Sequence, residues 1–218
     1  MRTTAATVRR QPRNADTRQR LLDAGLAVFA AEGFRKATIQ EISRRAGANI
    51  AAVSYYFGDK AGLYAAVFES AERQANDEDP WPLAGDGPPE QRLHAHIAGF
   101  LARLLDRDRR AVLAQLLARE MVEPTPALDR LVRRRMRSNH DHVATIIREL
   151  LGADADAETV RLCTLSVVAQ CVFYRNSAPI VARLYPDLDP PAHLTQLADH
   201  ITAFSLAAIR AQRAERAT

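Results

Sequence analysis

The chain has 218 residues, of which 47% are hydrophobic and 26% are charged, and its formal net charge is +4. This length is enough to bury a sizeable core in one or two domains. No apolar run approaches the roughly 18 residues needed to cross a bilayer, and the first residues lack the apolar core of a signal peptide. We therefore expect a cytoplasmic protein without a membrane partner.

The positive charge is concentrated in the N-terminal part of the chain. Residues 1–60 hold eleven Lys and Arg against five Asp and Glu, which leaves 19 against 21 for residues 61–218. Because nucleic acids carry a dense negative charge, this asymmetry indicates that the N-terminal part contacts phosphates. Residues 1–14 contain several arginines and no apolar periodicity, so we expect a disordered basic arm, either a solvated tail or an arm that follows DNA.

The first helix is expected where apolar residues begin to recur at helical spacing. This pattern starts at Asp16 and ends near Gly33, a residue type that commonly terminates helices. A second, short helix is indicated by Thr38 and Glu41, which stand three residues apart as in a capping box. In that arrangement the Thr38 hydroxyl accepts from the Glu41 amide, and the Glu41 carboxylate reaches back to the Thr38 amide.

A third helix follows the second after a tight turn. Gly47 ends the second helix because glycine takes the left-handed conformation without a steric cost, and Asn49 is placed to cap residues 50–56. This third helix buries Val53, while its opposite side carries only small residues and phenols. Two short helices joined by a glycine turn predict a helix-turn-helix, whose second helix enters a major groove of DNA.

The residues around this turn resemble those of a known family. Residues 21–63, and above all T-I-Q-E-I-S-R-R-A-G-A-N-I-A-A-V-S-Y-Y-F-G-D-K-A-G-L, are similar to the DNA-binding domain of the TetR family of transcriptional regulators. The resemblance rests on the spacing of Phe29, Gly33, Phe34, Thr38, Ile42, Ala46, Gly47, Val53, Tyr55, Phe57 and Lys60. The family usually has alanine at position 43 and a leucine-tyrosine pair at positions 53 and 54, where this chain has Ser43, Val53 and Ser54.

Two groups of side chains are expected at the DNA. We expect base edges to be read by Gln40, Asn49, Ile50, Ala51 and Ser54, and phosphates to be held by Thr38, Tyr55, Tyr56 and Lys60. Lys60 stands beside the start of a further helix that Asp59 can cap, and a helix N-terminus with free amides favours phosphate binding. This helix continues to about residue 75, before a loop rich in acid and proline.

The remaining chain is predicted to be helical. Apolar periodicity indicates helices over residues 89–105, 109–122, 128–151, 157–174 and 193–212, with a short one near 180–184. We find no credible strand alternation, so the predicted fold class is all-α. The predicted domains are the arm (1–14), a helix-turn-helix DNA-binding domain (15–62) and a helical effector-binding and dimerisation domain (63–218).

The last two long helices are apolar most of the way round. Such helices must be covered on more than one side, and in the TetR family two C-terminal helices of each subunit form a four-helix dimer interface. The resemblance implies a homodimer, and we expect its interface to include Leu165, Val168, Val172, Leu197, Ile201 and Phe204. The alternative is that both helices belong to the core of a monomer.

A second resemblance concerns the effector. Residues 119–131 and 170–186 are similar to the effector domain of the CecR-like regulators, which are repressors linked to membrane proteins and antibiotic sensitivity. Prolines 124 and 126 also keep the flanking helices from packing as one rod. We expect a largely apolar cavity for a small molecule, lined by Phe100, Leu104, Leu116, Glu120, Met121, Met136, His140 and Tyr174. For the polar members, ordinary structural hydrogen bonding stays open.

Enzymatic and cofactor sites are not indicated. His94 and His96, like His140 and His142, are two residues apart within helices, which points each pair in different directions and prevents chelation by either pair. A histidine site assembled across helices stays open. Phosphate loops and nucleophile elbows are absent. The cysteines at 163 and 171 are about 12 Å apart along one helix, too far for a disulfide.

The sequence therefore predicts a homodimeric transcriptional repressor of the TetR type that releases a near-palindromic operator when a small effector binds. Two other classes stay open. One is a ligand-independent DNA-binding protein with a purely structural C-terminal domain, and the other is a small-molecule-binding protein or enzyme with an incidental DNA-binding domain. Loss of operator binding on effector addition separates the first of these from the prediction, and turnover of a bound compound identifies the second.

Overall fold

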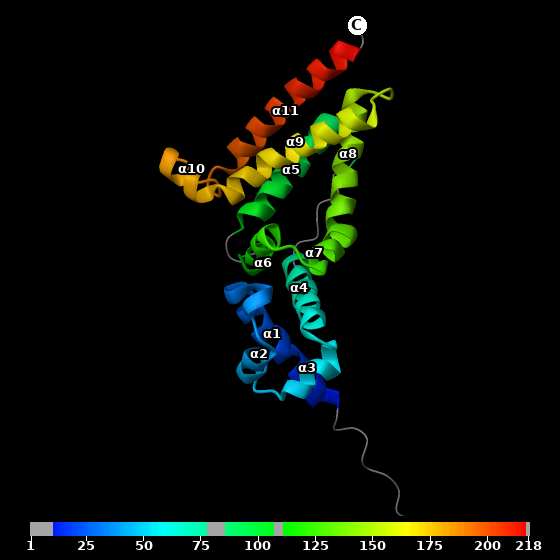
Figure 1. Cartoon of the computed structure of the whole chain (residues 1–218). Coiled ribbons are helices and arrows are strands. Elements are labelled where there is room, and N and C mark those ends of the chain that lie inside the picture. Colours follow the sequence, from blue (N-terminus) through cyan, green and yellow to red (C-terminus); the bar gives the residue numbers. More distant parts are fainter. Residues whose placement is uncertain (1–10, 78–85, 107–110, 217–218) are drawn as a thin grey trace, which may run out of the picture. The chain divides into compact units, whose positions relative to one another are not determined.

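The computed structural model describes residues 11–77, 86–106 and 111–216, and the regular structure over these residues is helical, as predicted. They fall into two compact units (Figure 1). Unit 1 contains residues 11–77 and 111–131, and unit 2 contains residues 86–106 and 132–216. Unit 1 extends beyond the 15–62 expected for the DNA-binding domain because later helices complete its core.

Unit 1 is built from six helices of the described residues: α1 (Gln11–Lys36), α2 (Ile39–Ala46), α3 (Ile50–Phe57), α4 (Lys60–Asp77), α6 (Ala111–Val122) and α7 (Pro126–Leu131). Helix α1 begins five residues before the predicted Asp16, and residues 1–10 of the predicted arm lie outside the described residues. Gly33 has a φ of 79° and interrupts α1 where the sequence predicted its end.

The core of unit 1 joins the early helices to α6 and α7. Helix α1 contacts α2, α4 and α6, and α4 contacts α6 and α7. The ring of Phe29 meets that of Tyr64 edge-on, with centroids 4.8 Å apart. The core includes Leu21, Phe29, Ile42, Val53, Leu63, Tyr64, Val67, Leu116 and Leu131. Burial of these side chains stabilises the position of α2 and α3, since neither is long enough to be stable alone.

A buried carboxylate adds specific polar contacts to this core. Glu120 is 1% exposed, and its Oε1 accepts a hydrogen bond from the Tyr64 hydroxyl at 2.7 Å. Its oxygens also accept from the Thr125 amide (2.8 Å) and the Thr125 hydroxyl (2.9 Å). Burial, and then this bond to Glu120, raise the pKa of the Tyr64 phenol. The cluster links α4 to the end of α6 and the turn before α7.

Arg119, beside Glu120, reaches the other early helix. Its Nε donates to the Ala30 carbonyl at 2.8 Å, and a second nitrogen donates to the Ala31 carbonyl. These carbonyls lie in the last turn before the Gly33 interruption of α1, where backbone acceptors lack helical partners. Two adjacent residues of α6 therefore hold α1 and α4.

Unit 2 is built from α5 (Pro89–Leu105), the π-helical turn η1 (Val132–Met136), α8 (Arg137–Leu151), α9 (Ala157–Asn176), α10 (Ala178–Leu184) and α11 (Leu194–Arg216). The single helix predicted over residues 128–151 is thus divided into α7, η1 and α8. The short helix predicted near 180–184 is present as α10. No helix among the described residues is long and apolar enough to cross a membrane.

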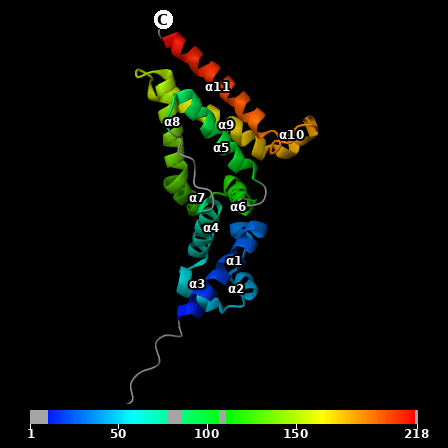
Figure 2. The same cartoon turned by 180° about the vertical axis from the view of Figure 1, so that it is seen from behind.

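Helix α5 is central to unit 2 and contacts α8, α9 and α11 (Figure 2). The apolar side chains that these helices share include Leu93, Ile97, Leu101, Val143, Ile147, Val167, Cys171, Leu197 and Ile201. His96 of α5 is 2% exposed, and burial, with the nearby His142, lowers its pKa to about 4. The core of unit 2 therefore contains imidazole as well as apolar side chains.

Candidate nucleic-acid interface

The helix-turn-helix is shaped by the caps that the sequence predicted. The Thr38 hydroxyl accepts from the Glu41 amide at 3.2 Å, and the Asn49 Oδ1 accepts from the Ala51 amide at 2.9 Å. Between them Gly47 takes a left-handed φ of 58°. Each bond satisfies a backbone donor at the start of a helix that has no helical acceptor, so both helices begin at defined residues.

One half of the predicted capping box is replaced by an ion-pair cluster. The Glu41 carboxylate accepts from Arg44 at 2.8 Å and from Arg45 at 2.5 Å rather than from the Thr38 amide. These hydrogen bonds lower the pKa of Glu41 to about 2. The two arginines one turn ahead of Glu41 are better partners for its carboxylate than a neutral amide.

Helix α3 presents the outer face that the sequence predicted for base readout. Val53 is fully buried, whereas Ile50 is 50% and Tyr55 is 75% exposed. Other exposed residues expected at the DNA are Thr38, Gln40, Asn49, Ala51 and Ser54, and Tyr56 and Lys60 are half-buried. The outer face carries no long side chain apart from Tyr55, so its backbone can approach another surface closely.

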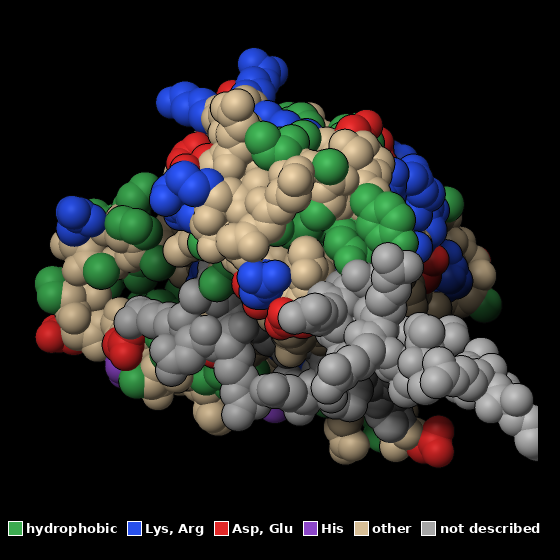
Figure 3. Space-filling model, turned by 90° about the horizontal axis from the view of Figure 1, so that it is seen from below, with side chains coloured by type: hydrophobic (Ala, Val, Ile, Leu, Met, Phe, Trp, Pro, Cys, Tyr) green, Lys and Arg blue, Asp and Glu red, His purple; other side chains and the backbone are tan. Residues whose placement is uncertain are grey.

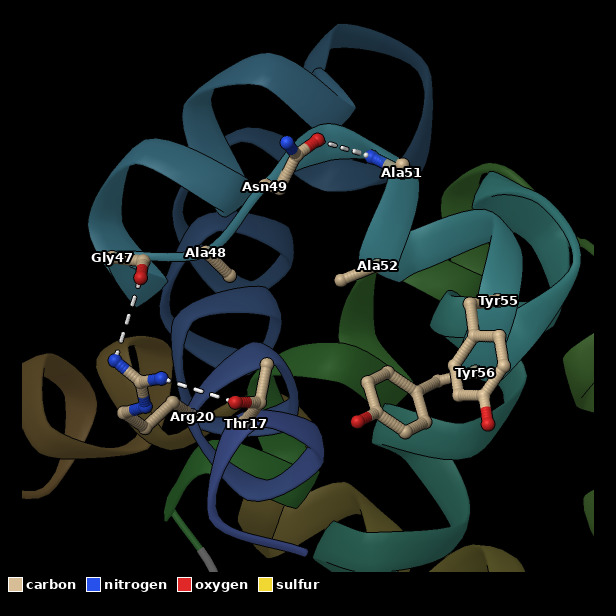
Figure 4. Close-up of a pocket in the computed structure, with 9 residues that line it drawn as sticks. All are labelled: Thr17, Arg20, Gly47, Ala48, Asn49, Ala51, Ala52, Tyr55 and Tyr56. Carbon is tan, nitrogen blue, oxygen red and sulfur yellow. Dashed lines mark hydrogen bonds between the residues drawn. The ribbon is translucent and has the colours of Figure 1, made fainter. Parts of the chain in front are cut away.

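An open groove of about 760 Å³ lies beside this face (Figure 4). One wall comes from the α2–α3 turn and α3, with Asn49, Tyr55 and Tyr56, and the other comes from Thr17 and Arg20 of α1. Figure 4 shows both phenols projecting from α3, with the two α1 side chains across from them. The groove therefore brings hydroxyls, an amide and a guanidinium together.

Thr17 and Arg20 were not predicted from the sequence. Arg20 donates to the Gly47 carbonyl at 3.4 Å and to the Thr17 hydroxyl at 3.2 Å, and its side chain is 45% exposed. A salt bridge of 3.5 Å to Asp16 adds a third contact. The available signal was weak: Arg20 stands on the polar side of α1, and only the fold places that side next to Gly47.

Lys60 is engaged within unit 1. Its ammonium donates to the Arg35 carbonyl at 3.1 Å and lies 4.8 Å from the centre of the Phe34 ring. Asp59 caps α4 as predicted, because its Oδ1 accepts from the Gly62 amide at 2.7 Å. If Lys60 contacts a phosphate, it does so with an ammonium that already donates a hydrogen bond to the end of α1.

Gly62 allows the close approach of α3 and α4. A Cβ at this position would lie 1.9 Å from the Phe57 carbonyl oxygen, far inside van der Waals contact. Only glycine fits here without a movement of the backbone, and the spacing between α3 and α4 depends on it.

The charges near this surface are mixed. Figure 3 shows Lys and Arg side chains standing out at several places of the face seen from below, with Asp and Glu side chains between them. Ion pairs such as Arg44 with Glu41 explain part of this pattern. Such pairs place acidic groups beside arginines on the surface and leave the net excess of positive charge in residues 1–60 unchanged.

The residues predicted to line an effector cavity are divided between the units. Leu116 is fully buried in the core of unit 1, Glu120 is hydrogen-bonded there, and Met121 is 60% exposed. In unit 2, Phe100, Leu104 and Tyr174 pack against the core, Met136 is 39% exposed, and His140 is half-buried. Leu116 and Glu120 thus have structural partners that the sequence did not predict.

The residues predicted for dimerisation also differ in exposure. Leu165 of α9 is 50% and Phe204 of α11 is 61% exposed, and Val168 and Val172 are half-buried. Leu197 and Ile201 are buried in the core of unit 2, because they lie on the inward side of α11. Leu162 and Phe173, not selected from the sequence, are 53% and 52% exposed.

Family models match both parts of the chain. A model described as "Bacterial regulatory proteins, tetR family" matches residues 21–67, and one described as "HTH-type transcriptional dual regulator CecR, C-terminal domain" matches residues 89–209, more than half of the chain. The chain belongs to the TetR family of transcriptional regulators, with a CecR-type C-terminal domain. This TetR-family chain is thus a DNA-binding regulator and not an enzyme.

Curated relatives and solved structures agree with this placement. The chain is 28% identical over 168 residues to the transcriptional dual regulator CecR of Shigella flexneri, covering 72% of this chain and 75% of that protein. It is 37% identical over 84 residues to the regulator BetI of Escherichia coli O139:H28, covering 38% and 43%. A TetR-family structure from Mesorhizobium loti superposes with a TM-score of 0.60 at 18% identity, covering 90% and 98%. That structure shares the fold.

Proposed function

We propose that this TetR-family regulator is a homodimeric, ligand-responsive repressor that binds a near-palindromic operator through α3. The observation that carries the proposal is the outer face of α3, which is exposed, free of long charged side chains and bordered by a groove of hydrogen-bonding groups. Such a face can lie against base edges while the groove contacts the adjacent backbone.

The roles of the residues divide by chemistry. Asn49 uses its Oδ1 as a helix cap, which leaves its amide nitrogen to donate to a base acceptor. Gln40, Ile50, Ala51 and Ser54 join it in base readout. Thr38, Tyr55 and Tyr56 hold phosphates, and Thr17 and Arg20 extend this set across the groove. The Lys60 ammonium holds the end of α1 through the Arg35 carbonyl, and the same ammonium contacts a phosphate.

The DNA-binding proposal is tested by separating base readout from backbone contact. Asn49→Ser keeps the cap but removes the amide donor, so a binding-site selection should give an altered motif. Arg20→Ala should weaken binding to all sequences alike and lower the salt slope of affinity by about one per subunit. Arg148→Ala, an exposed arginine of unit 2, is the control. An unchanged motif for Asn49→Ser removes Asn49 from base readout.

The dimer proposal rests on large exposed apolar side chains of unit 2. Leu162, Leu165 and Phe173 of α9 and Phe204 of α11 are each at least half exposed. A second copy of the chain would cover them, and each subunit would bring one α3 to its half-site. Phe204→Asp should give a monomer by light scattering and abolish operator binding. Val122→Asp, 80% exposed in unit 1, is the control. A monomer that binds a half-site as tightly as the parent binds the operator contradicts the proposal.

The effector proposal is placed in unit 2, where Phe100, Leu104 and Tyr174 lie beside the core. A ligand that binds one conformation tenfold more tightly contributes about 1.4 kcal/mol, so the operator complex must be poised close to release. Among a panel of apolar drug-like compounds, some should release a labelled operator from the wild type. Phe100→Trp should keep operator binding and lose this response. Release that persists in Phe100→Trp, or no release by any compound, favours a different site or ligand-independent binding.

A further inference from the structure

Two helices of unit 2 bring two imidazoles together, the buried His96 and the partly buried His142. The rings of His96 on α5 and His142 on α8 have centroids 5.9 Å apart. The salt bridge of 2.6 Å between Arg92 and Glu149 joins the same two helices. The two contacts show that the helices run antiparallel, because residue numbers rise along α5 as they fall along α8. The imidazole pair is therefore a built feature of the α5–α8 packing.

Helix α8 carries two buried polar atoms at or near this pair. The Nε2 of His142 and the Oδ1 of Asn139 are both buried and have no hydrogen-bond partner among the described residues. Asn139 precedes His142 by three residues, so both side chains lie on the same side of α8. Buried polar atoms in native proteins nearly always have a partner, and one left alone costs about 1–3 kcal/mol. Both atoms can offer a lone pair to an added ion, His142 Nε2 in the tautomer that is protonated at Nδ1.

We propose that this site binds a transition-metal ion of the zinc or cobalt type, with His96 and His142 as imidazole ligands and the Asn139 amide oxygen as a third. Zinc lies about 2.0–2.1 Å from an imidazole nitrogen, and two imidazoles on one tetrahedral ion place their ring centres roughly 5–6 Å apart. The separation of the His96 and His142 rings agrees with this value.

The two imidazoles and the amide oxygen determine which metal ions the proposed site favours and how tightly it binds them. Imidazole favours zinc, cobalt, nickel and copper over magnesium or calcium. Within the described residues no group of three or more His, Cys, Asp or Glu side chains could hold a metal, so the proposed site has two strong ligands and one weaker amide oxygen. Water or a donor atom of a small molecule completes the coordination. The ion would join α5 to α8 and stabilise unit 2.

The sequence supplies matched controls at the same spacing. His94 and His140 lie two residues before His96 and His142 on the same helices, and their side chains are each 42% exposed. His94 contacts Asp199 at 2.8 Å, and His140 contacts Asp141 at 3.4 Å. These two histidines are more accessible than His96 and would hold the ion if binding took place at the surface.

The test uses the full chain without an affinity tag, freed of metal by a chelator that is then removed. Zn²⁺ is titrated by calorimetry, and Co²⁺ is followed by its visible absorption. One ion should bind per chain, with a rise in the thermal unfolding midpoint. His96→Ala and His142→Ala should each weaken binding at least tenfold, and Asn139→Ala by a few fold. His94→Ala and His140→Ala should stay within about twofold of the wild type.

Circular dichroism of each variant checks that it is folded, and His142→Gln is the second variant if His142→Ala is not. Absence of binding by the wild type overturns the proposal, as does binding lost in His94→Ala or His140→Ala but kept in His96→Ala and His142→Ala. Operator binding is measured separately on the metal-free chain. A chain that binds DNA but no metal contradicts this inference alone, and one that binds metal but no DNA contradicts the proposed function alone.

Discussion

The two units contain buried polar clusters of opposite character. In unit 1 both oxygens of Glu120 accept hydrogen bonds from Tyr64 and Thr125. In unit 2 Asn139 Oδ1 and His142 Nε2 are buried without a described partner. A cluster whose members satisfy one another stabilises the fold, whereas a cluster with unused acceptors is suited to an added ligand. Burial of polar groups thus has different consequences in the two units.

The largest effect is expected from breaking the satisfied cluster. Glu120→Ala leaves the Tyr64 hydroxyl and the Thr125 amide without their acceptor, and it should lower the free energy of unfolding by about 3 kcal/mol. Urea denaturation measures this change. Glu123 lies three residues after Glu120 and forms an exposed ion pair with Arg35. Glu123→Ala should lower the free energy of unfolding by less than about 0.5 kcal/mol. Equal effects of the two substitutions would show that the buried cluster has no special stabilising role.

Tyr64→Phe tests the same cluster by its pH dependence. It should cost about 1–2 kcal/mol at pH 7, because Glu120 loses one donor. Since the folded-state pKa of Tyr64 lies above its ordinary 10.0, its contribution to stability is fully present below pH 10 and is lost as the pH rises further. Denaturation from pH 8 to 11 should therefore show a steeper loss for the wild type than for Tyr64→Phe. Parallel curves would contradict this assignment.

Ser43 of α2 is a buried hydroxyl in unit 1. It is 1% exposed, and its Oγ has no partner among the described residues. Ser43→Ala should raise the free energy of unfolding by about 0.5–1 kcal/mol, since a desolvated hydroxyl is removed. It should leave Zn²⁺ binding unchanged. Thermal denaturation detects the gain, and a loss of stability would mean that the hydroxyl has a partner in solution.

The smallest effect is expected in unit 2 without metal. His142→Leu removes an unused buried nitrogen but also the ring contact with His96. Because these two effects oppose each other, the free energy of unfolding should change by less than about 0.5 kcal/mol in the presence of chelator. The urea denaturation used for Glu120→Ala measures this change in the free energy of unfolding. A loss of 2 kcal/mol or more would place His142 in a satisfied structural network like that of Glu120.

Features set by neighbouring residues could be predicted from the sequence alone. The caps by Thr38, Asn49 and Asp59 are confirmed, and so is the left-handed turn at Gly47. These bonds join residues two or three positions apart, so no distant segment competes for them. The all-α fold class and the membership of the TetR family followed from the same short-range patterns.

Contacts between residues distant in the chain were decided by the tertiary structure. Local spacing gave no sign that Arg20 would meet Gly47, that Lys60 would hold the Arg35 carbonyl, or that Glu120 would bond to Tyr64.

Periodicity also identified α11 as apolar without separating the inward Ile201 from the outward Phe204. A helix that is apolar nearly all round does not reveal which side its neighbours occupy. The packing of α5, α8 and α9 against α11 decides that, and it also brings His96 of α5 to His142 of α8.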